Sequence, residues 1–243
     1  MSESLSLSAY ETEVAVLYRL MNAEVKTWPF PHFYVRDVFP AQTYQALVDR
    51  LPADAAYDAM GEHGTVGQDS YKERLILSLE SKRASVDAPW RDLAGWMLGE
   101  RFAKAMLKKF APYIRAQWGE SVARQKVMKD ARLVRDFTRY ALSPHTDMPE
   151  KVLAFLFYLP RDDRFAHLGT SLYVPNDPDF TCPGGPHHPR DRFTLLGTAD
   201  YLPNSLFGFI RTDRAFHGVE PVADADARRD LLLYNLYFIE SAG

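Results

Sequence analysis

The second half of the chain is a series of short apolar runs separated by turn residues. After Val127, runs rich in Leu, Phe, Tyr and Val alternate with Pro, Gly and Asp. Short apolar runs with such boundaries are typical of β-strands. We expect strands over residues 131–140, 151–159, 170–174, 192–196, 205–210 and 230–239. Consecutive strands of this kind fold into a β-sandwich or a barrel.

The first half has helical patterning. Helices are expected over residues 9–23 and 41–51, followed by two more between Pro89 and Trp118 that are broken near Gly99. Residues 32–39 look extended, and residues 53–85, with three glycines between Gly61 and Gly67, fit a loop excursion. We find no internal repeat and no linker, so the 243 residues fit one α+β, mainly β domain. Its expected parts are a mainly helical support over 1–126 and a jelly-roll core over 127–243.

Charge argues against a broad nucleic-acid-binding surface, because the net charge is -3 and the pI is about 6.2. One stretch departs from this balance: residues 101–139 carry eleven Lys and Arg against three acids. It is either a solvated helix face or a positive rim for an anionic substrate.

A single cysteine, Cys182, excludes an intramolecular disulfide and fits a reducing compartment. Residues 1–10 are Ser-rich and lack the basic start and apolar core of a signal peptide. No apolar run approaches the roughly 20 residues that cross a bilayer. We therefore expect a cytoplasmic protein without a membrane segment.

His145 and Asp147 form the one His-x-Asp pair of the chain. Composition alone gives about 0.6 such pairs by chance, so the pair needs support from its position. It lies between the expected strands 131–140 and 151–159, where side chains at i and i+2 point to the same side. His217, which precedes the last strand, is the best third ligand. Two histidines and one carboxylate suit non-haem iron(II) and oxygen.

The remaining histidines compete less well. His32 and His63 lie in the helical half, and His167 precedes a turn. His187 and His188 share the loop 175–191 with Cys182, so a second metal site is conceivable there. Four prolines and two glycines between residues 176 and 189 favour a mobile surface loop instead, with a role as a lid.

Four segments together resemble a known family. They are Ser143-Pro144-His145-Thr146-Asp147, Phe157-Tyr158-Leu159-Pro160, Gly169-Thr170-Ser171-Leu172 and His217-Gly218-Val219-Glu220-Pro221-Val222. Their order and spacing resemble the 2-oxoglutarate and iron(II)-dependent oxygenase superfamily, in its prolyl-hydroxylase-like branch. The resemblance covers about residues 130–240. It implies a double-stranded β-helix, a cupin-like jelly-roll barrel, with N-terminal supporting helices and the metal near one open end.

The resemblance also implies Fe(II) with the co-substrates 2-oxoglutarate and O2. Family members hold the distal carboxylate of 2-oxoglutarate with a basic residue after the second histidine, and Arg228 and Arg229 are the candidates here. An inward Arg228 would bring Asp230 inward with it, so alternation favours Arg229. Arg229 follows His217 by twelve residues, further than is usual in the family. Tyr158 is either a hydrogen-bond donor to the same carboxylate, as related enzymes often have there, or a core aromatic of its strand. Tyr140 and Arg139, just before the His-x-Asp pair, are expected with less support to line the pocket.

The implied reaction is hydroxylation of an unactivated carbon of a small molecule or a peptide side chain, with release of succinate and CO2. Related halogenases carry a small residue in place of the carboxylate, so Asp147 favours hydroxylation. Desaturation or ring closure would use the same site. Two alternatives stay open: a catalytically silent jelly-roll binding module, and a cupin-like metalloenzyme that does not use 2-oxoglutarate.

Overall fold

The structure, a computed structural model, describes residues 7–60, 73–120 and 125–239. The helices are α1 (Ala9–Asn22), α2 (Ala41–Asp49), α3 (Ala88–Met97) and α4 (Glu100–Trp118). The strands are β1 (His32–Arg36), β2 (Asp58–Ala59), β3 (Arg74–Ser78), β4 (Lys126–Phe137), β5 (Leu142–His145), β6 (Lys151–Tyr158), β7 (Thr170–Pro175), β8 (Phe193–Ala199), β9 (Ser205–Ile210), β10 (His217–Val219) and β11 (Arg228–Ile239).

Local sequence signals set the helix ends. Ser8 and Glu11 form a capping box at the start of α1, in which each side chain accepts from the other residue's backbone N–H. Asp87 and the following Pro89 start α3, a position where the missing N–H of proline costs nothing. Gly99 separates α3 from α4, as the sequence predicts. α4 ends at Gly119, whose φ of 74° suits glycine.

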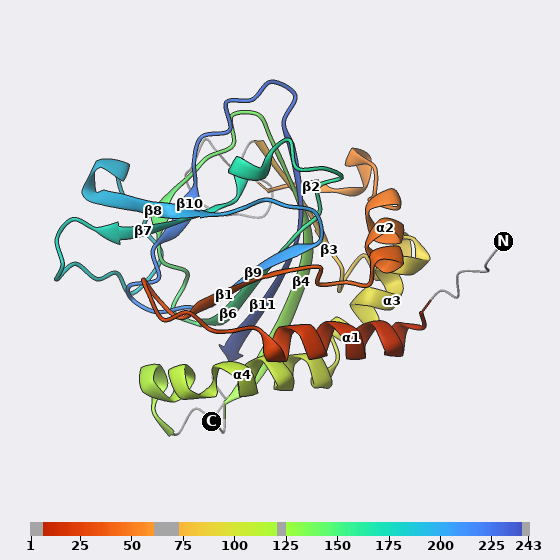
Figure 1. The fold of residues 1–243 in the computed structure, drawn as a ribbon, viewed down its shortest axis with the longest axis horizontal. Helices are drawn as coiled ribbons and strands as arrows, with labels where there is room; N and C mark the ends of the chain where they lie inside the picture. The colour runs from red at the N-terminus through yellow and green to blue at the C-terminus, as the bar shows by residue number, and fades with distance from the viewer. Residues whose placement is uncertain (1–6, 61–72, 121–124, 240–243) are drawn as a thin grey trace.

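Two antiparallel sheets make up the β part (Figure 1). The larger has the order β1-β9-β6-β11-β4-β3-β2, and the smaller has the order β5-β10-β7-β8. From β4 to β11 the chain passes repeatedly between the sheets, which is the strand order of a jelly roll. The expected double-stranded β-helix is therefore present, as two facing sheets.

Strands from the first half of the chain extend the larger sheet, which sequence patterning largely missed. β1 pairs with β9, and β3 pairs with β4. The short strands β5 and β10 were not expected either. β4 begins before the expected start at residue 131 and ends at Phe137, and Arg139 then takes a left-handed φ of 76°. The Gly61–Gly67 part of the expected loop, and His63 with it, lie outside the described residues.

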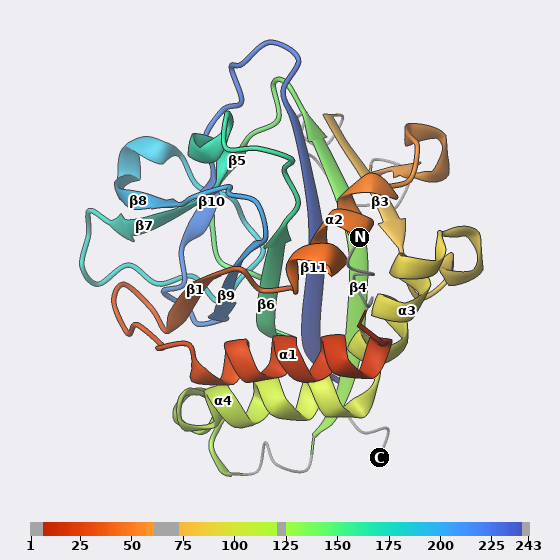
Figure 2. The ribbon, with the colours of Figure 1, turned by 45° about the vertical axis from the view of Figure 1, so that its right-hand side comes forward.

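The main core lies between the larger sheet and the helices. Figure 2 shows α1 and α4 side by side across this sheet. Phe102 of α4 packs edge-on against Tyr234 of β11, with ring centroids 5.0 Å apart. Phe110 packs against Phe155 of β6, with ring centroids 6.4 Å apart. Side chains that point to the opposite face of the same strands, such as Ala154 and Leu231, belong to a second apolar cluster on the inner face of the sheet.

The helices therefore cover the outer face of the larger sheet, away from the smaller sheet. This arrangement favours the interpretation of the basic stretch over residues 101–139 as a solvated face over its interpretation as a positive rim for an anionic substrate. Of the basic residues between 101 and 139 that the structure describes, Arg132 is the one in the wall of the cavity between the sheets. Among the described residues, no helix combines the length and apolar character needed to cross a bilayer.

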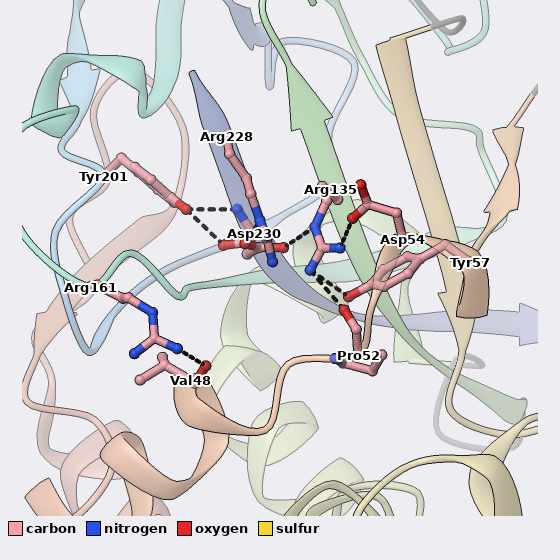
Figure 3. Close-up of polar contacts among 9 residues, drawn as sticks. All are labelled: Val48, Pro52, Asp54, Tyr57, Arg135, Arg161, Tyr201, Arg228 and Asp230. Atoms are coloured by element: carbon pink, nitrogen blue, oxygen red, sulfur yellow. Dashed lines mark hydrogen bonds and ion pairs between the residues drawn. The ribbon is translucent and has the colours of Figure 1, made fainter. Parts of the chain in front are cut away.

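A polar network around Asp230 anchors β11 (Figure 3). Arg135 of β4 lies opposite Asp230 in the ladder and donates to its carboxylate at 2.7 Å. Arg135 also pairs with Asp54, so the segment before β2 is tied to the sheet. The Tyr201 hydroxyl accepts from the Asp230 N–H at 2.7 Å and donates to the Asp230 carbonyl at 3.0 Å. A fully satisfied network of this kind fixes the strand in one position.

Candidate metal and co-substrate site

The structure brings His145, Asp147 and His217 together. His145 ends β5, His217 begins β10, and the two are paired in the antiparallel ladder. Asp147 follows His145 by two residues, and one ligand atom from each of the three side chains lies within 4.8 Å of the others. The Nε2 atom of His217 is 3.8 Å from Oδ2 of Asp147. The three side chains therefore converge as the sequence predicts.

Backbone carbonyls orient both imidazoles. Nδ1 of His145 donates to the carbonyl of Ser143 at 3.0 Å, and Nδ1 of His217 donates to the carbonyl of Ala215 at 2.9 Å. These bonds assign the proton to Nδ1 and leave Nε2 as the ligand atom. Burial lowers the pKa of both imidazoles, so both stay neutral at pH 7, as metal ligands must.

Lys151 holds the Asp147 carboxylate from the side away from the histidines. Its ammonium donates to Oδ1 at 2.8 Å. Burial alone would raise the pKa of Asp147, but the charge and hydrogen bond of Lys151 help to hold that pKa below its usual range. Oδ2 is buried and makes no hydrogen bond among the described residues. An ionised carboxylate with one unbonded buried oxygen, beside two neutral imidazoles, is a donor set that suits Fe(II).

The loop that carries His187 packs directly on this centre. The His187 ring stacks on the His145 ring, with centroids 4.4 Å apart and planes 2° from parallel. The N–H of His188 donates to the carbonyl of Pro144 at 2.9 Å, and the Thr146 hydroxyl donates to the carbonyl of Cys182 at 2.9 Å. Burial lowers the pKa of His187 to about 4.

Cys182 lies in an aromatic cluster with Phe193 and Phe216. Within the part of the chain that the structure describes, Cys182, His187 and His188 form no group that could hold a second metal. The loop instead supplies Gly185, Pro186 and His187 to the wall of the cavity that contains the three candidate ligands.

Gly184 lets this loop approach the Asp147 backbone. Its φ is 116°, and a Cβ at this position would collide with the carbonyl oxygen of Asp147. We expect Gly184→Ala to lower the free energy of unfolding by about 2 kcal/mol, because an L-residue is strained there and the loop must move. Denaturant unfolding measures the change.

Gly197→Ala is the matched control for this prediction. Gly197 lies in the edge strand β8, and a Cβ there meets nothing within 4 Å. The control should change the free energy of unfolding by less than about 0.5 kcal/mol. Equal losses in the two variants would show that the contact with Asp147 is unimportant.

A cavity of about 520 Å³ lies between the sheets and contains the three candidate ligands. Along β11 its wall is formed by residues of one phase: Arg229, Leu231, Leu233, Asn235 and Tyr237. The Arg229 side chain is 1% exposed, whereas that of Arg228 is 47% exposed, pairs with Asp230 and is absent from the cavity wall. Strand alternation thus places Arg229, and not Arg228, in the cavity with the three candidate ligands.

The other residues expected at the co-substrate, Tyr158, Tyr140 and Arg139, are not part of the cavity wall. Tyr158 is buried outside the cavity wall, and its hydroxyl donates at 2.8 Å to the Thr170 hydroxyl, which belongs to the wall. Burial raises the pKa of Tyr158 to about 12. Tyr140 is also buried outside the wall, beneath the guanidinium of Arg74 at 4.3 Å. Arg139 has a side chain 79% exposed and pairs with Glu73, so its expected place in the pocket is wrong.

Sequence patterning missed three charged residues near the site. Lys151 and Arg74 are both in the cavity wall, and Asp136 is fully buried beside Arg229. Asp136 could have been found from its position in β4. It lies two residues after Val134, so an acidic side chain points to the same inner side of the sheet as this apolar residue. Such a buried acid requires a partner, which points to a basic residue on a neighbouring strand.

Comparisons with known proteins agree with this fold. No protein-family model and no curated protein matches the chain. Among solved structures, the chain is similar to the non-haem alpha-ketoglutarate-dependent epimerase SnoN from nogalamycin biosynthesis, with 13% identity, a TM-score of 0.53, and coverage of 94% of this chain and 81% of SnoN. It also matches a Pseudomonas putida prolyl-4-hydroxylase at 16% identity, with a TM-score of 0.47 and coverage of 93% and 98%.

A Trichoplax adhaerens prolyl hydroxylase, solved with a peptide fragment of the hypoxia-inducible factor oxygen degradation domain, matches at 11% identity, with a TM-score of 0.47 and coverage of 94% and 90%. At these sequence identities the similarities are evidence for the fold alone. The fold assignment rests on SnoN, whose TM-score is 0.53. The chain therefore has the double-stranded β-helix fold found in non-haem alpha-ketoglutarate-dependent enzymes. The resemblance seen in the sequence is confirmed at the level of the fold.

Proposed function

We propose that this protein is a non-haem iron(II) and 2-oxoglutarate-dependent oxygenase. One observation carries the proposal: His145, Asp147 and His217 converge within 4.8 Å in a cavity whose wall also contains the buried Arg229. A metal site next to a buried guanidinium suits a ligand that has a metal-binding head and a distal carboxylate. 2-Oxoglutarate is such a ligand.

Each residue has a definite part in this proposal. The Nε2 atoms of the two histidines and Oδ2 of Asp147 hold Fe(II). Arg229 binds the distal carboxylate, because a guanidinium edge matches a carboxylate with two parallel hydrogen bonds. Thr170, held by Tyr158, offers a hydroxyl in the cavity wall. The bound iron supplies the activation of O2 that is coupled to decarboxylation of 2-oxoglutarate.

The substrate is proposed to be a small molecule or a peptide side chain. Asp130, Arg132 and Lys151 contribute charged groups to the cavity wall, which favours a polar substrate. We propose hydroxylation as the outcome because a carboxylate, Asp147, stands at the metal. SnoN has the same fold and is an epimerase, so the fold permits other outcomes.

The deciding experiment is a succinate-release assay with the iron-loaded protein and panels of metabolites and peptides. We expect succinate formation that requires both Fe(II) and 2-oxoglutarate and that rises when a substrate is present. A binding module without turnover would bind 2-oxoglutarate and release no succinate with any panel member. A cupin-like metalloenzyme of another kind would bind metal and show no affinity for 2-oxoglutarate.

A further inference from the structure

Three charged residues form a row across neighbouring strands at the edge of the cavity. Arg74 of β3 lies opposite Asp136 of β4, and Asp136 lies opposite Arg229 of β11. Their side chains are 11%, 0% and 1% exposed, in that order. Both arginines belong to the cavity wall, and Asp136 lies between them. The strand pairing of the larger sheet therefore holds the three side chains next to one another.

Asp136 is bound by both arginines at once. Arg74 contacts it through two parallel hydrogen bonds, from Nε to Oδ1 at 2.6 Å and from Nη2 to Oδ2 at 2.9 Å. Arg229 contacts it through Nη1, which lies 2.5 Å from Oδ2. Tyr140 supports Arg74 from below, with the guanidinium 4.3 Å from the ring centroid. Tyr140 thus reaches the co-substrate region through Arg74.

The bond from Nη1 orients the rest of the Arg229 guanidinium. Its Nε is buried and has no hydrogen-bond partner among the described residues. The central carbon of the guanidinium lies over the Tyr201 ring, 5.5 Å from the ring centroid. The edge formed by Nε and Nη2 is therefore the one left to receive a carboxylate in a two-bond pair.

Charge balance shows what Arg74 contributes. Asp136 and Arg229 alone form a neutral pair, and a carboxylate brought to that pair would meet Asp136 as a second buried negative charge. With Arg74, the three side chains carry a net charge of +1, and one carboxylate neutralises them. In a buried site this difference is large, because charges there are poorly screened.

We propose that Arg74 is a positioning residue that offsets the charge of Asp136 and so allows Arg229 to bind the carboxylate of 2-oxoglutarate. The proposal rests on the proposed function, and it assigns a specific part in that site to a residue from the first half of the chain. It predicts a coupling: the need for Arg74 exists because of Asp136. Removing the acid should remove that need.

The test is calorimetric titration of 2-oxoglutarate into the full-length Mn(II)-loaded protein. Arg74→Met should weaken the affinity at least about tenfold, which is about 1.4 kcal/mol. In the double variant Arg74→Met with Asp136→Asn, the affinity should return to within about threefold of the wild type, because the pair is coupled through charge. A double variant as weak as Arg74→Met, or an Arg74→Met variant that binds like the wild type, would overturn the proposal.

Further variants separate charge from folding. Arg74→Lys keeps the charge and should keep most of the affinity, whereas the neutral Arg74→Gln should lose it, with circular dichroism showing that both fold. Arg139→Met is the matched control, because Arg139 is a neighbouring but exposed arginine and its loss should leave the affinity unchanged. An equal loss in the Lys and Gln variants would contradict the charge argument.

Glutarate, titrated without metal, distinguishes failure of this inference from failure of the proposed function. If the wild type binds glutarate in an Arg74-dependent way but not 2-oxoglutarate, the role of Arg74 in carboxylate binding at Arg229 stands and the proposed function fails. If the wild type binds 2-oxoglutarate but Arg74 has no influence, the inference alone fails. If the wild type binds neither, both fail.

Discussion

Asp147→Asn is expected to weaken Fe(II) binding by at least about 100-fold, since it removes the one anionic ligand from the three candidate ligands. Asparagine has the shape of aspartate and still offers an oxygen to Lys151, so the backbone around the site should keep its position. The two histidines remain neutral and oriented by Ser143 and Ala215. They are not sufficient by themselves to hold the metal tightly. Anaerobic calorimetric titration with Fe(II) measures the loss.

Asp130→Asn is the matched control for this variant. Asp130 is an acid in the wall of the same cavity, and it pairs with Arg132 at 2.8 Å instead of facing the histidines. Its replacement should leave Fe(II) affinity within about threefold of the wild type, since effects fall off with distance from the ligands. The metal assignment would be wrong if Asp147→Asn bound Fe(II) as the wild type does, or if the two variants lost the metal equally.

Arg229→Met should weaken the affinity for 2-oxoglutarate by about 100-fold while leaving Fe(II) affinity unchanged. A bidentate pair with a carboxylate in a buried site is worth about 1.5–3 kcal/mol for each charged hydrogen bond. Removal of Arg229 does not strand Asp136, because Arg74 still binds both of its oxygens. The variant should therefore fold, and the loss should be confined to the co-substrate. Titration of 2-oxoglutarate into the Mn(II)-loaded protein measures it.

Arg228→Met is the natural control, since it changes the adjacent residue on the opposite face of β11. Arg228 pairs with Asp230 at 2.7 Å outside the cavity, and its loss should leave 2-oxoglutarate affinity unaffected. The reverse result, with Arg228→Met impaired and Arg229→Met unimpaired, would reassign the carboxylate site. Loss of Fe(II) affinity in Arg229→Met would mean that the arginine supports the metal centre itself.

The convergence of the three candidate ligands was predictable because the information for each is local. The spacing of His145 and Asp147 places both on one side of an extended segment, and His217 precedes a strand that patterning detects. The choice of Arg229 over Arg228 also follows from the alternation along one strand. The structure places the whole inward phase of β11 in the cavity wall, from Arg229 to Tyr237.

The residues that patterning missed depend on pairing between distant segments. β3 is short and lies in a weakly patterned region, so nothing local placed Arg74 beside Asp136. β10 spans just three residues, His217–Val219, too few to show alternation. His187 stacks on His145 because Gly184 allows a close approach of two loops, and a proline-rich segment gives no sign of that contact in sequence.

The pairing of β11 with its two neighbours has a consequence for how chains of this kind are found. Arg229 is held opposite Asp136 by a continuous ladder that runs from Arg228 to Ile239, and β6 holds the same strand from the other side. The ladder sets the position of Arg229 across from Asp136, whatever the number of residues between β10 and β11. The unusual distance in sequence from His217 to Arg229 is therefore a property of the connecting loop. A search for related chains should therefore look for an acidic residue paired with the arginine on the neighbouring strand, as Asp136 is with Arg229. It should allow any number of residues between the second histidine and the arginine.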